Sequence, residues 1–241
     1  METSRGLSGR LHLRVAVGPR PPRLLLVDGD LGRRATLAVA LGTRYAVDTA
    51  AGAHEAHTSA TLAPFDLAVL DAAVLGASLP RLVRVLRARS RAVRLVIIAG
   101  PRDLRGRHYA ATLGVDARLG RLVPAYALLD RIDALVGIAG RGARFDRGVG
   151  RAIDLMARDV THLLDVNALA DATGVSLPVL AERFRAETGL TVYEYVTRVR
   201  VAVAEQLLRE TDLGVATLAA LLGFADAAEL ARAAAVSSLG P

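Results

Sequence analysis

Short, continuous apolar runs alternate with helix-like stretches over the first 137 residues. The apolar runs, which read as strands, lie at 23–28, 45–50, 65–71, 94–99 and 116–119. The stretches with helical character between them lie at 31–42, 52–62, 77–89, 102–113 and 124–137. Strands that alternate with helices in this way form a parallel sheet with right-handed crossovers, and strands without a polar side are covered on both faces. The pattern therefore predicts an α/β domain with a five-stranded parallel sheet over residues 23–137.

The pattern changes at GIAGRGARFDRGVG, residues 137–150, which holds five glycines and four charged residues. We interpret residues 138–150 as a linker. Beyond it the strand pattern is absent, and residues 151–241 read as consecutive helices of an all-α domain. The most regular helix is TVYEYVTRVRVAVAEQLLRE, in which six apolar residues recur at spacings of three to four: Val192, Tyr195, Val196, Val199, Val203 and Leu207.

Composition narrows the class of protein. The chain has no cysteine, which excludes disulfides and thiolate metal sites. It also has no uncharged apolar run of the ~18 residues that a membrane span requires. Residues 1–23 carry five arginines and only a short apolar patch, interrupted by Arg14, so they lack the apolar core of a signal peptide. We expect residues 1–22 to be a flexible basic arm of a cytoplasmic protein.

Arginine supplies all 31 basic residues, and the net charge of +7 is unevenly distributed. Residues 1–137 hold 20 arginines against 11 acids, whereas residues 138–241 hold 11 arginines against 13 acids. A basic chain is typical of nucleic-acid binding, but here the surplus lies in the first half. Because attraction to phosphates normally dominates DNA affinity, we expect the helical half alone to bind DNA weakly.

Three aspartates follow two of the predicted strands. Asp28 and Asp30 come after the first strand, and Asp71 ends the third. In an open parallel sheet, ligands bind beyond the carboxyl ends of the strands. Paired carboxylates there can hold a divalent ion beside a third that accepts a phosphoryl group. Aspartates at strand ends are also common turn formers, and spacing alone favours this simpler interpretation.

This half resembles the receiver domain of two-component response regulators over about residues 22–137. The resemblance rests on the order of the elements and on LLLVDGD, FDLAVLD and GVDARLGRLV. It implies a flavodoxin-like receiver fold in which Asp71 is the phosphoacceptor and Asp28 is the first acid of a Mg²⁺ site. It also implies two candidate partners, which are a sensor kinase or other protein and a second copy of the chain bound through this domain.

The sequence departs from the receiver pattern inside the pocket. Gly29 stands where the family has its second metal-binding acid, Gly100 where it has Thr or Ser, and Arg121 where it has Lys. Asp30 replaces the missing acid only if its loop bends to bring it in. Arginine keeps the charge but presents a planar fork instead of a compact ammonium group. We therefore expect a degenerate receiver that is not phosphorylated, with Mg²⁺ as a cofactor only if the pocket still functions.

Two segments of the helical half have the pattern of a helix-turn-helix. In VNALADATGVSLPVLAERFRAETG, residues 166–189, the first helix ends at Gly174. Ser176 can cap the second helix, and Pro178 lies in its first turn.

The second segment is VATLAALLGFADAAELARAAA, residues 215–235, with Gly223 at the turn and Asp226 as the candidate cap. A helix of about 20 residues joins the two units, which suits two successive major-groove faces of DNA. Ala-rich helix pairs also build plain bundles, and this alternative stays open.

Residues 148–241 resemble the DNA-binding domain of the AraC/XylS family of bacterial transcription regulators. The matching pieces are LADATGVS, LAERFRAETGLTVYEYV, RVRVAVAEQLL and LAALLGFAD. The resemblance places the exposed recognition positions at Pro178, Ala181, Glu182 and Arg185 in the first unit, and at Ala227, Ala228, Ala231 and Arg232 in the second.

Alanine offers a base at most a contact with a thymine methyl group, so we expect the first unit to carry most of the base reading. The residues expected at the DNA surface are Ser176, Pro178, Ala181, Glu182, Arg185 and Arg232. Phosphate contacts are expected from Arg185, Arg198, Arg200 and Arg232.

These features predict a transcription regulator that binds double-stranded DNA and joins a degenerate receiver to an AraC-type double helix-turn-helix. The alternative is a regulatory scaffold whose receiver-like half binds a partner and whose helical half has lost specific DNA binding. We do not expect an enzyme, because the sequence has no P-loop, no GxGxxG after a strand and no Ser-His-Asp spacing.

Overall fold

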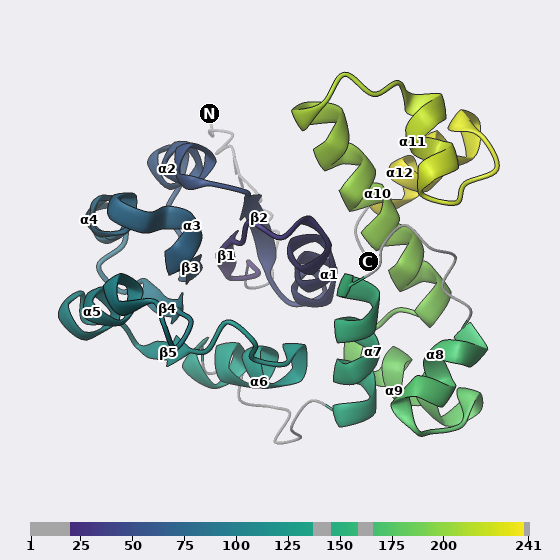
Figure 1. Ribbon diagram of the computed structural model, residues 1–241, viewed down its shortest axis with the longest axis horizontal. Coiled ribbons are helices and arrows are strands. Elements are labelled where there is room, and N and C mark those ends of the chain that lie inside the picture. The colour runs from purple at the N-terminus through teal and green to yellow at the C-terminus, as the bar shows by residue number, and fades with distance from the viewer. Residues whose placement is uncertain (1–19, 137–145, 159–165, 239–241) are drawn as a thin grey trace, which may run out of the picture.

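The computed structural model describes residues 20–136, 146–158 and 166–238 (Figure 1). Residues 1–19 of the predicted basic arm lie outside the described residues. The first half contains β1 (Arg23–Val27), α1 (Leu31–Gly42), β2 (Ala46–Ala50), α2 (Ala53–Leu62), β3 (Leu67–Asp71), α3 (Ala72–Leu75), the 3-10 helix η1 (Gly76–Ser78), α4 (Leu79–Arg89), β4 (Arg94–Ile98), α5 (Leu104–Thr112), β5 (Ala117–Leu119) and α6 (Ala125–Val136). The predicted strands and helices of this half are confirmed, with most ends within two residues.

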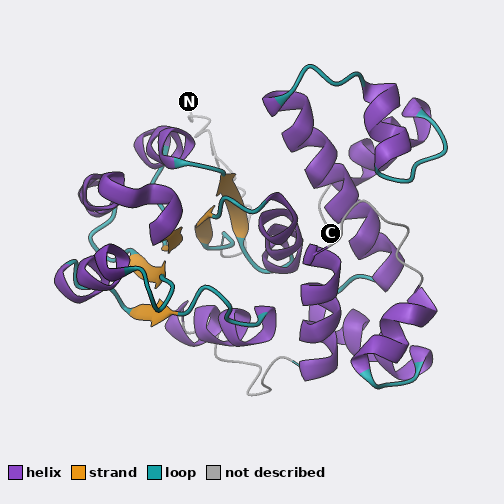
Figure 2. Ribbon diagram, viewed as in Figure 1, coloured by secondary structure: helices purple, strands orange, loops and turns teal. Residues whose placement is uncertain are grey.

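The five strands form one sheet in the order β2-β1-β3-β4-β5, and every pair is parallel (Figure 2). This is the flavodoxin-like order of a doubly wound sheet, in which the chain reverses direction across the sheet between β1 and β3. In the register of β1 with β3, Val27 pairs with Leu70. The next residues along the two strands, Asp28 and Asp71, therefore meet at the carboxyl edge of the sheet.

Successive residues of the strands enter two different apolar layers, because side chains alternate across a sheet. On β1, Leu24 and Leu26 belong to the core that α1 and α6 cover. Leu25 and Val27 belong to the core on the opposite face, which α2 and α4 cover and against which α5 packs. The single-turn helix α3, directly after Asp71, was not predicted.

The described residues of the second half form helices joined by turns and loops, without a strand, as predicted (Figure 2). Its helices are α7 (Arg147–Arg158), α8 (Val166–Thr173), α9 (Leu177–Thr188), α10 (Val192–Glu210), α11 (Val215–Leu221) and α12 (Ala227–Ser238). Helix α7 begins at Arg147, so the last four residues of the predicted linker are helical instead. Among the described helices, none is both long and apolar enough to cross a membrane.

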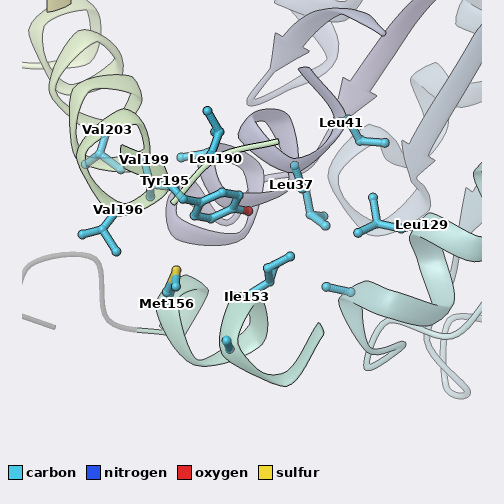
Figure 3. Close-up of a cluster of buried hydrophobic side chains, with 14 of the residues drawn as sticks. Leu37, Leu41, Leu129, Ile153, Met156, Leu190, Tyr195, Val196, Val199 and Val203 are labelled. Atoms are coloured by element: carbon cyan, nitrogen blue, oxygen red, sulfur yellow. The ribbon is translucent and has the colours of Figure 1, made fainter. Parts of the chain in front are cut away.

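One apolar core runs through both halves of the chain. Helix α1 packs against α7 and α10 as well as against the sheet. Figure 3 shows Leu37 of α1 facing Ile153 of α7 and Tyr195 of α10, with Leu41 further along α1 and Met156 of α7 below the Tyr195 ring. All five side chains are at most 2% exposed. The helical half is therefore docked on α1, which is buried between the sheet and the helices of the second half.

Helix α7 also approaches α6 closely, and a glycine makes this approach feasible. A Cβ atom at Gly150 would lie 2.4 Å from Cβ of Tyr126 on α6. The carboxylate of Asp154, one turn further along α7, accepts a hydrogen bond from the amide of Ala125 at the start of α6, at 3.0 Å. Gly150 lies in the predicted linker, whereas the structure places it in α7, where the absence of a side chain allows α7 to pack closely against α6.

Candidate functional site

Asp28 and Asp71 lie side by side at the carboxyl edge of the sheet, as predicted. Both residues are only 2% exposed. Burial raises the pKa of Asp28, and the negative charge of Asp71 adds to this effect. The amide of Asp30 and the guanidinium of Arg33 oppose it. Two neighbouring buried carboxylates are expensive to keep ionised, so the pocket needs nearby positive charge.

Two arginines supply this charge. Nη2 of Arg121 lies 3.5 Å from Oδ2 of Asp71, and Nε of Arg33 lies 3.5 Å from Oδ2 of Asp28. Nη1 of Arg33 also donates to the backbone carbonyl of Arg121 at 2.5 Å, which ties the two arginine-bearing segments together. The role of Arg33 was missed, although its place in the first turn after the acids was a readable signal.

Asp30 does not join the pocket. It is exposed, and its carboxylate accepts a hydrogen bond from the amide of Arg33 at 2.8 Å, so it caps the start of α1. No group of three or more metal-ligating side chains occurs in the part of the chain that the structure describes. The acidic pair is already engaged by arginines and the third acid faces its own helix, so this donor set does not fit a Mg²⁺ ion.

Val74 of α3 lies close to Gly29, at which the receiver resemblance implies a second acid. A Cβ atom at Gly29 would lie 2.9 Å from Cγ2 of Val74. Any larger residue at position 29 must displace this methyl group, and valine is stiff at χ1. With Val74 in this place, an acidic side chain at position 29 would therefore clash with its methyl group. This contact could not be predicted from the sequence, in which Val74 is an ordinary apolar residue.

The first helix-turn-helix consists of α8 and α9, as predicted. Gly174 has a φ of 78° in the turn between them, a conformation that favours glycine. Leu180 and Phe184 on α9 are completely buried, so one side of this helix faces the domain core. Ser176 occupies the N-cap position, but its side chain makes no capping hydrogen bond, which corrects the predicted cap.

The second helix-turn-helix consists of α11 and α12. Gly223 has a φ of 76° in its turn, and Oδ1 of Asp226 accepts the amide of Glu229 at 2.7 Å, which confirms the predicted cap. Helix α10 joins the two units. It begins with a capping box in which Thr191 and Glu194 bond to each other's backbone amides.

The residues expected to read DNA are all on the surface of the whole chain. All six are exposed: Ser176, Pro178, Ala181, Glu182, Arg185 and Arg232. The docking of the helical half on α1 therefore leaves these positions accessible. They carry one anionic and two cationic side chains, a mixture that can contact both base edges and phosphates.

Two of the four arginines expected at DNA phosphates are placed differently. Arg185 and Arg232 are exposed, whereas Arg198 and Arg200 are partly buried. Arg198 lines a groove of about 610 Å³ between α10 and the α/β domain, opposite Val39. Burial lowers the pKa of Arg200. Arg198 shares this groove with Ala38 and Val39 of α1, so it lies at the junction of the two halves and not on the fully exposed surface expected for a phosphate contact.

The fold and these helix pairs define a protein with a receiver-like α/β domain and a helix-turn-helix domain. Residues 169–235 match the family model described as a helix-turn-helix domain. In sequence, the chain is 35% identical over 88 residues to an AraC-like transcription regulator of Streptomyces antibioticus, which covers 36% of this chain and 29% of the relative. It is 32% identical over 99 residues to the HTH-type transcriptional activator RhaS of Enterobacter sp. (strain 638), covering 41% of this chain and 34% of the relative. The chain thus spans about a third of the length of these curated relatives.

Solved structures of receiver domains are similar to the first half. A CheY-like receiver domain protein from Methanospirillum hungatei is 22% identical with a TM-score of 0.43, covering 48% of this chain and 94% of that one. A response regulator receiver protein from Burkholderia phymatum is 26% identical with a TM-score of 0.40, covering 49% of this chain and 98% of that one.

Proposed function

We propose that this chain is a sequence-specific DNA-binding transcription regulator whose receiver-like domain works without phosphorylation. The main support for DNA binding is that α9 has one buried side and one exposed side. Leu180 and Phe184 are buried in the core, whereas Ala181, Glu182 and Arg185 are exposed. This division is what a helix inserted into a major groove requires.

The pocket supports independence from phosphorylation. A phosphoryl group on Asp71 would need a divalent ion to neutralise it, and Arg33 and Arg121 already accompany the two buried acids. Val74 adjoins the position from which a second acid would bind that ion. The receiver-like domain then acts by its shape and its contacts with the helical half, and not by a chemical switch at Asp71.

The two units divide the work unequally in this proposal. On α9, Glu182 can accept a hydrogen bond from the amino group of cytosine, and Arg185 can bind a phosphate. On α12, the exposed positions Ala228 and Ala231 offer only methyl groups, beside the exposed Arg232. The relatives named as a transcription regulator and a transcriptional activator support the same reading, and such a protein would act in the cytoplasm.

The test is selection of binding sequences from random duplex DNA by the full-length chain, purified without any phosphodonor. We expect one enriched motif, with base preferences at the positions that α9 contacts. A motif repeated about two helical turns apart would indicate a homodimer, whereas a single copy would indicate a monomer. If no motif is enriched at any salt concentration, the protein is instead an interaction scaffold that has lost specific DNA binding.

A further inference from the structure

Tyr195 connects the α/β domain to the helical half. Its side chain is fully buried, and its hydroxyl donates a hydrogen bond to the backbone carbonyl of Thr36 in the middle of α1, at 2.5 Å. A buried tyrosine hydroxyl without a partner would be costly, so this bond fixes the preferred position of α10 relative to α1. Figure 3 shows the ring of Tyr195 directed toward α1 between Leu190 and Leu37.

The same ring supports the helix that we expect to read DNA. Tyr195 and Phe184 of α9 form an edge-to-face pair with ring centroids 5.0 Å apart and an interplanar angle of 86°. This is a favourable geometry for two aromatic rings. Phe184 lies directly beside Arg185 and two residues from Glu182, which are exposed on the other side of α9. One side chain therefore contacts α1 with its hydroxyl and α9 with its ring.

A second contact holds the far end of α10 to α1. Arg34 of α1 is 3% exposed, and its Nη1 donates to the backbone carbonyl of Asp28 at 2.5 Å. Its Nη2 lies 4.0 Å from Oε1 of Glu210, the last residue of α10. A buried guanidinium needs an opposite charge nearby, and here a residue of the helical half provides it. Helix α1 thus contacts α10 near both of its ends, through a hydrogen bond at Tyr195 and a longer ion pair at Glu210.

We propose that Tyr195 is a positioning residue through which α1 of the α/β domain holds the reading helix α9 in place. The α/β domain is then a fixed support of the DNA-binding surface. The docked arrangement agrees with this role, because it leaves Glu182 and Arg185 exposed while it buries Tyr195 and Phe184. The effect of Tyr195 on DNA reading rests on the proposed DNA-binding function. The coupling of α1 to α9 through Tyr195 does not, because it can be measured in the protein without DNA.

The test is hydrogen–deuterium exchange of the full chain without DNA. Tyr195→Phe removes the hydroxyl and keeps the ring, so we expect amides of both α1 and α9 to exchange roughly fivefold faster, as for the loss of one hydrogen bond. Tyr193→Phe is the matched control, because Tyr193 lies on the same helix but is 70% exposed. It should leave exchange unchanged in both helices.

Phe184→Leu gives an independent readout if Tyr195→Phe folds poorly. It removes the ring pair and keeps the hydroxyl bond, so α9 should exchange faster while α1 keeps its protection. Faster exchange of α1 alone in Tyr195→Phe, or equal acceleration throughout the sheet, would overturn the proposal. The two proposals can fail independently. If the wild-type chain enriches no DNA motif but the exchange results are as expected, the proposed DNA-binding function is wrong and the positioning role of Tyr195 stands.

Discussion

Nη2 of Arg121 lies 3.5 Å from Oδ2 of Asp71, so a cation already accompanies the carboxylate that the receiver pattern marks for phosphorylation. Arg121 itself is partly exposed, with 46% of its side chain accessible, whereas the Asp71 side chain is 3% accessible. The arginine is therefore the solvent-facing partner of this pair, and Asp71 is the buried one.

We expect a small phosphodonor with Mg²⁺ to leave the mass of the full-length protein unchanged. Intact-mass spectrometry after incubation with acetyl phosphate measures this directly, with Asp71→Asn as the control. The physical reason is that Arg33 and Arg121 accompany the acids that a metal ion would need. A stoichiometric gain of one phosphoryl group, abolished by Asp71→Asn, would show that the pocket still functions.

Asp28→Asn should stabilise the protein increasingly as the pH rises. Burial raises the pKa of Asp28 above its ordinary value of 3.8, so the folded state holds this proton more tightly than the unfolded state does. Ionisation of Asp28 therefore costs no stability below the ordinary value, and the cost grows as the pH rises through the raised pKa. Urea unfolding of both proteins between about pH 4 and pH 7 measures the difference. An advantage of the variant that shrinks as the pH rises would contradict this assignment.

Gly150→Ala should destabilise the chain by about 1–3 kcal/mol, as overpacking between closely packed elements usually does. The new methyl group would meet Cβ of Tyr126 at 2.4 Å. Gly42→Ala is the matched control, because a Cβ atom there, at the end of α1, would meet nothing within 4 Å apart from its chain neighbours and the backbone of its own helix. Chemical denaturation compares the two variants. If Gly150→Ala is no less stable than Gly42→Ala, α6 and α7 do not approach as closely as described.

Three substitutions should separate base reading from phosphate binding. Glu182→Ala should relax the preference at one base position, where a good contact discriminates by about 1–3 kcal/mol. Arg185→Ala should weaken binding to all sequences and lower the log–log salt slope by about one. Arg232→Ala should cost less than Arg185→Ala. Competition titrations on the selected motif and its variants decide this, and a larger loss in Arg232→Ala would make α12 the main reader.

The secondary structure of the first half could be predicted from the alternation of short apolar runs with helical stretches. Buried parallel strands such as β3 and β4 consist mostly of apolar residues, which makes these runs easy to recognise. The first turn of α7, residues 147–150, did not follow from this pattern. Glycines normally mark a linker, and a single sequence does not distinguish such a glycine from Gly150, which is needed for contact with Tyr126. The pattern of residues along the chain does not reveal that Gly150 packs against Tyr126, and this contact is what distinguishes it from a linker glycine.

The docking of the two halves was also absent from the sequence interpretation, although α1 carried a signal. Its sequence LGRRATLAVALG consists of small and apolar residues on nearly every side, which is typical of a helix buried all round. Arg33, Arg34 and Thr36 interrupt this pattern. The buried guanidinium of Arg34 donates to the backbone carbonyl of Asp28, and the hydroxyl of Thr36 donates to the backbone carbonyl of Gly32. Asp28 and Asp71 could be predicted to meet, because the carboxyl ends of neighbouring parallel strands lie at the same edge of the sheet. Val74 and Tyr195 could not be singled out, because their importance depends on contacts with residues distant in the sequence.

The central claim is sequence-specific DNA binding that does not depend on phosphorylation of Asp71. Equilibrium titration of the selected motif and of a scrambled duplex, at one physiological salt concentration, tests it most directly with wild type, Asp71→Asn, and wild type treated with acetyl phosphate and Mg²⁺. We expect all three proteins to prefer the motif over the scrambled duplex by the same factor, about 10³-fold or more. A preference that appears only after treatment with the phosphodonor, and is lost in Asp71→Asn, would contradict the account.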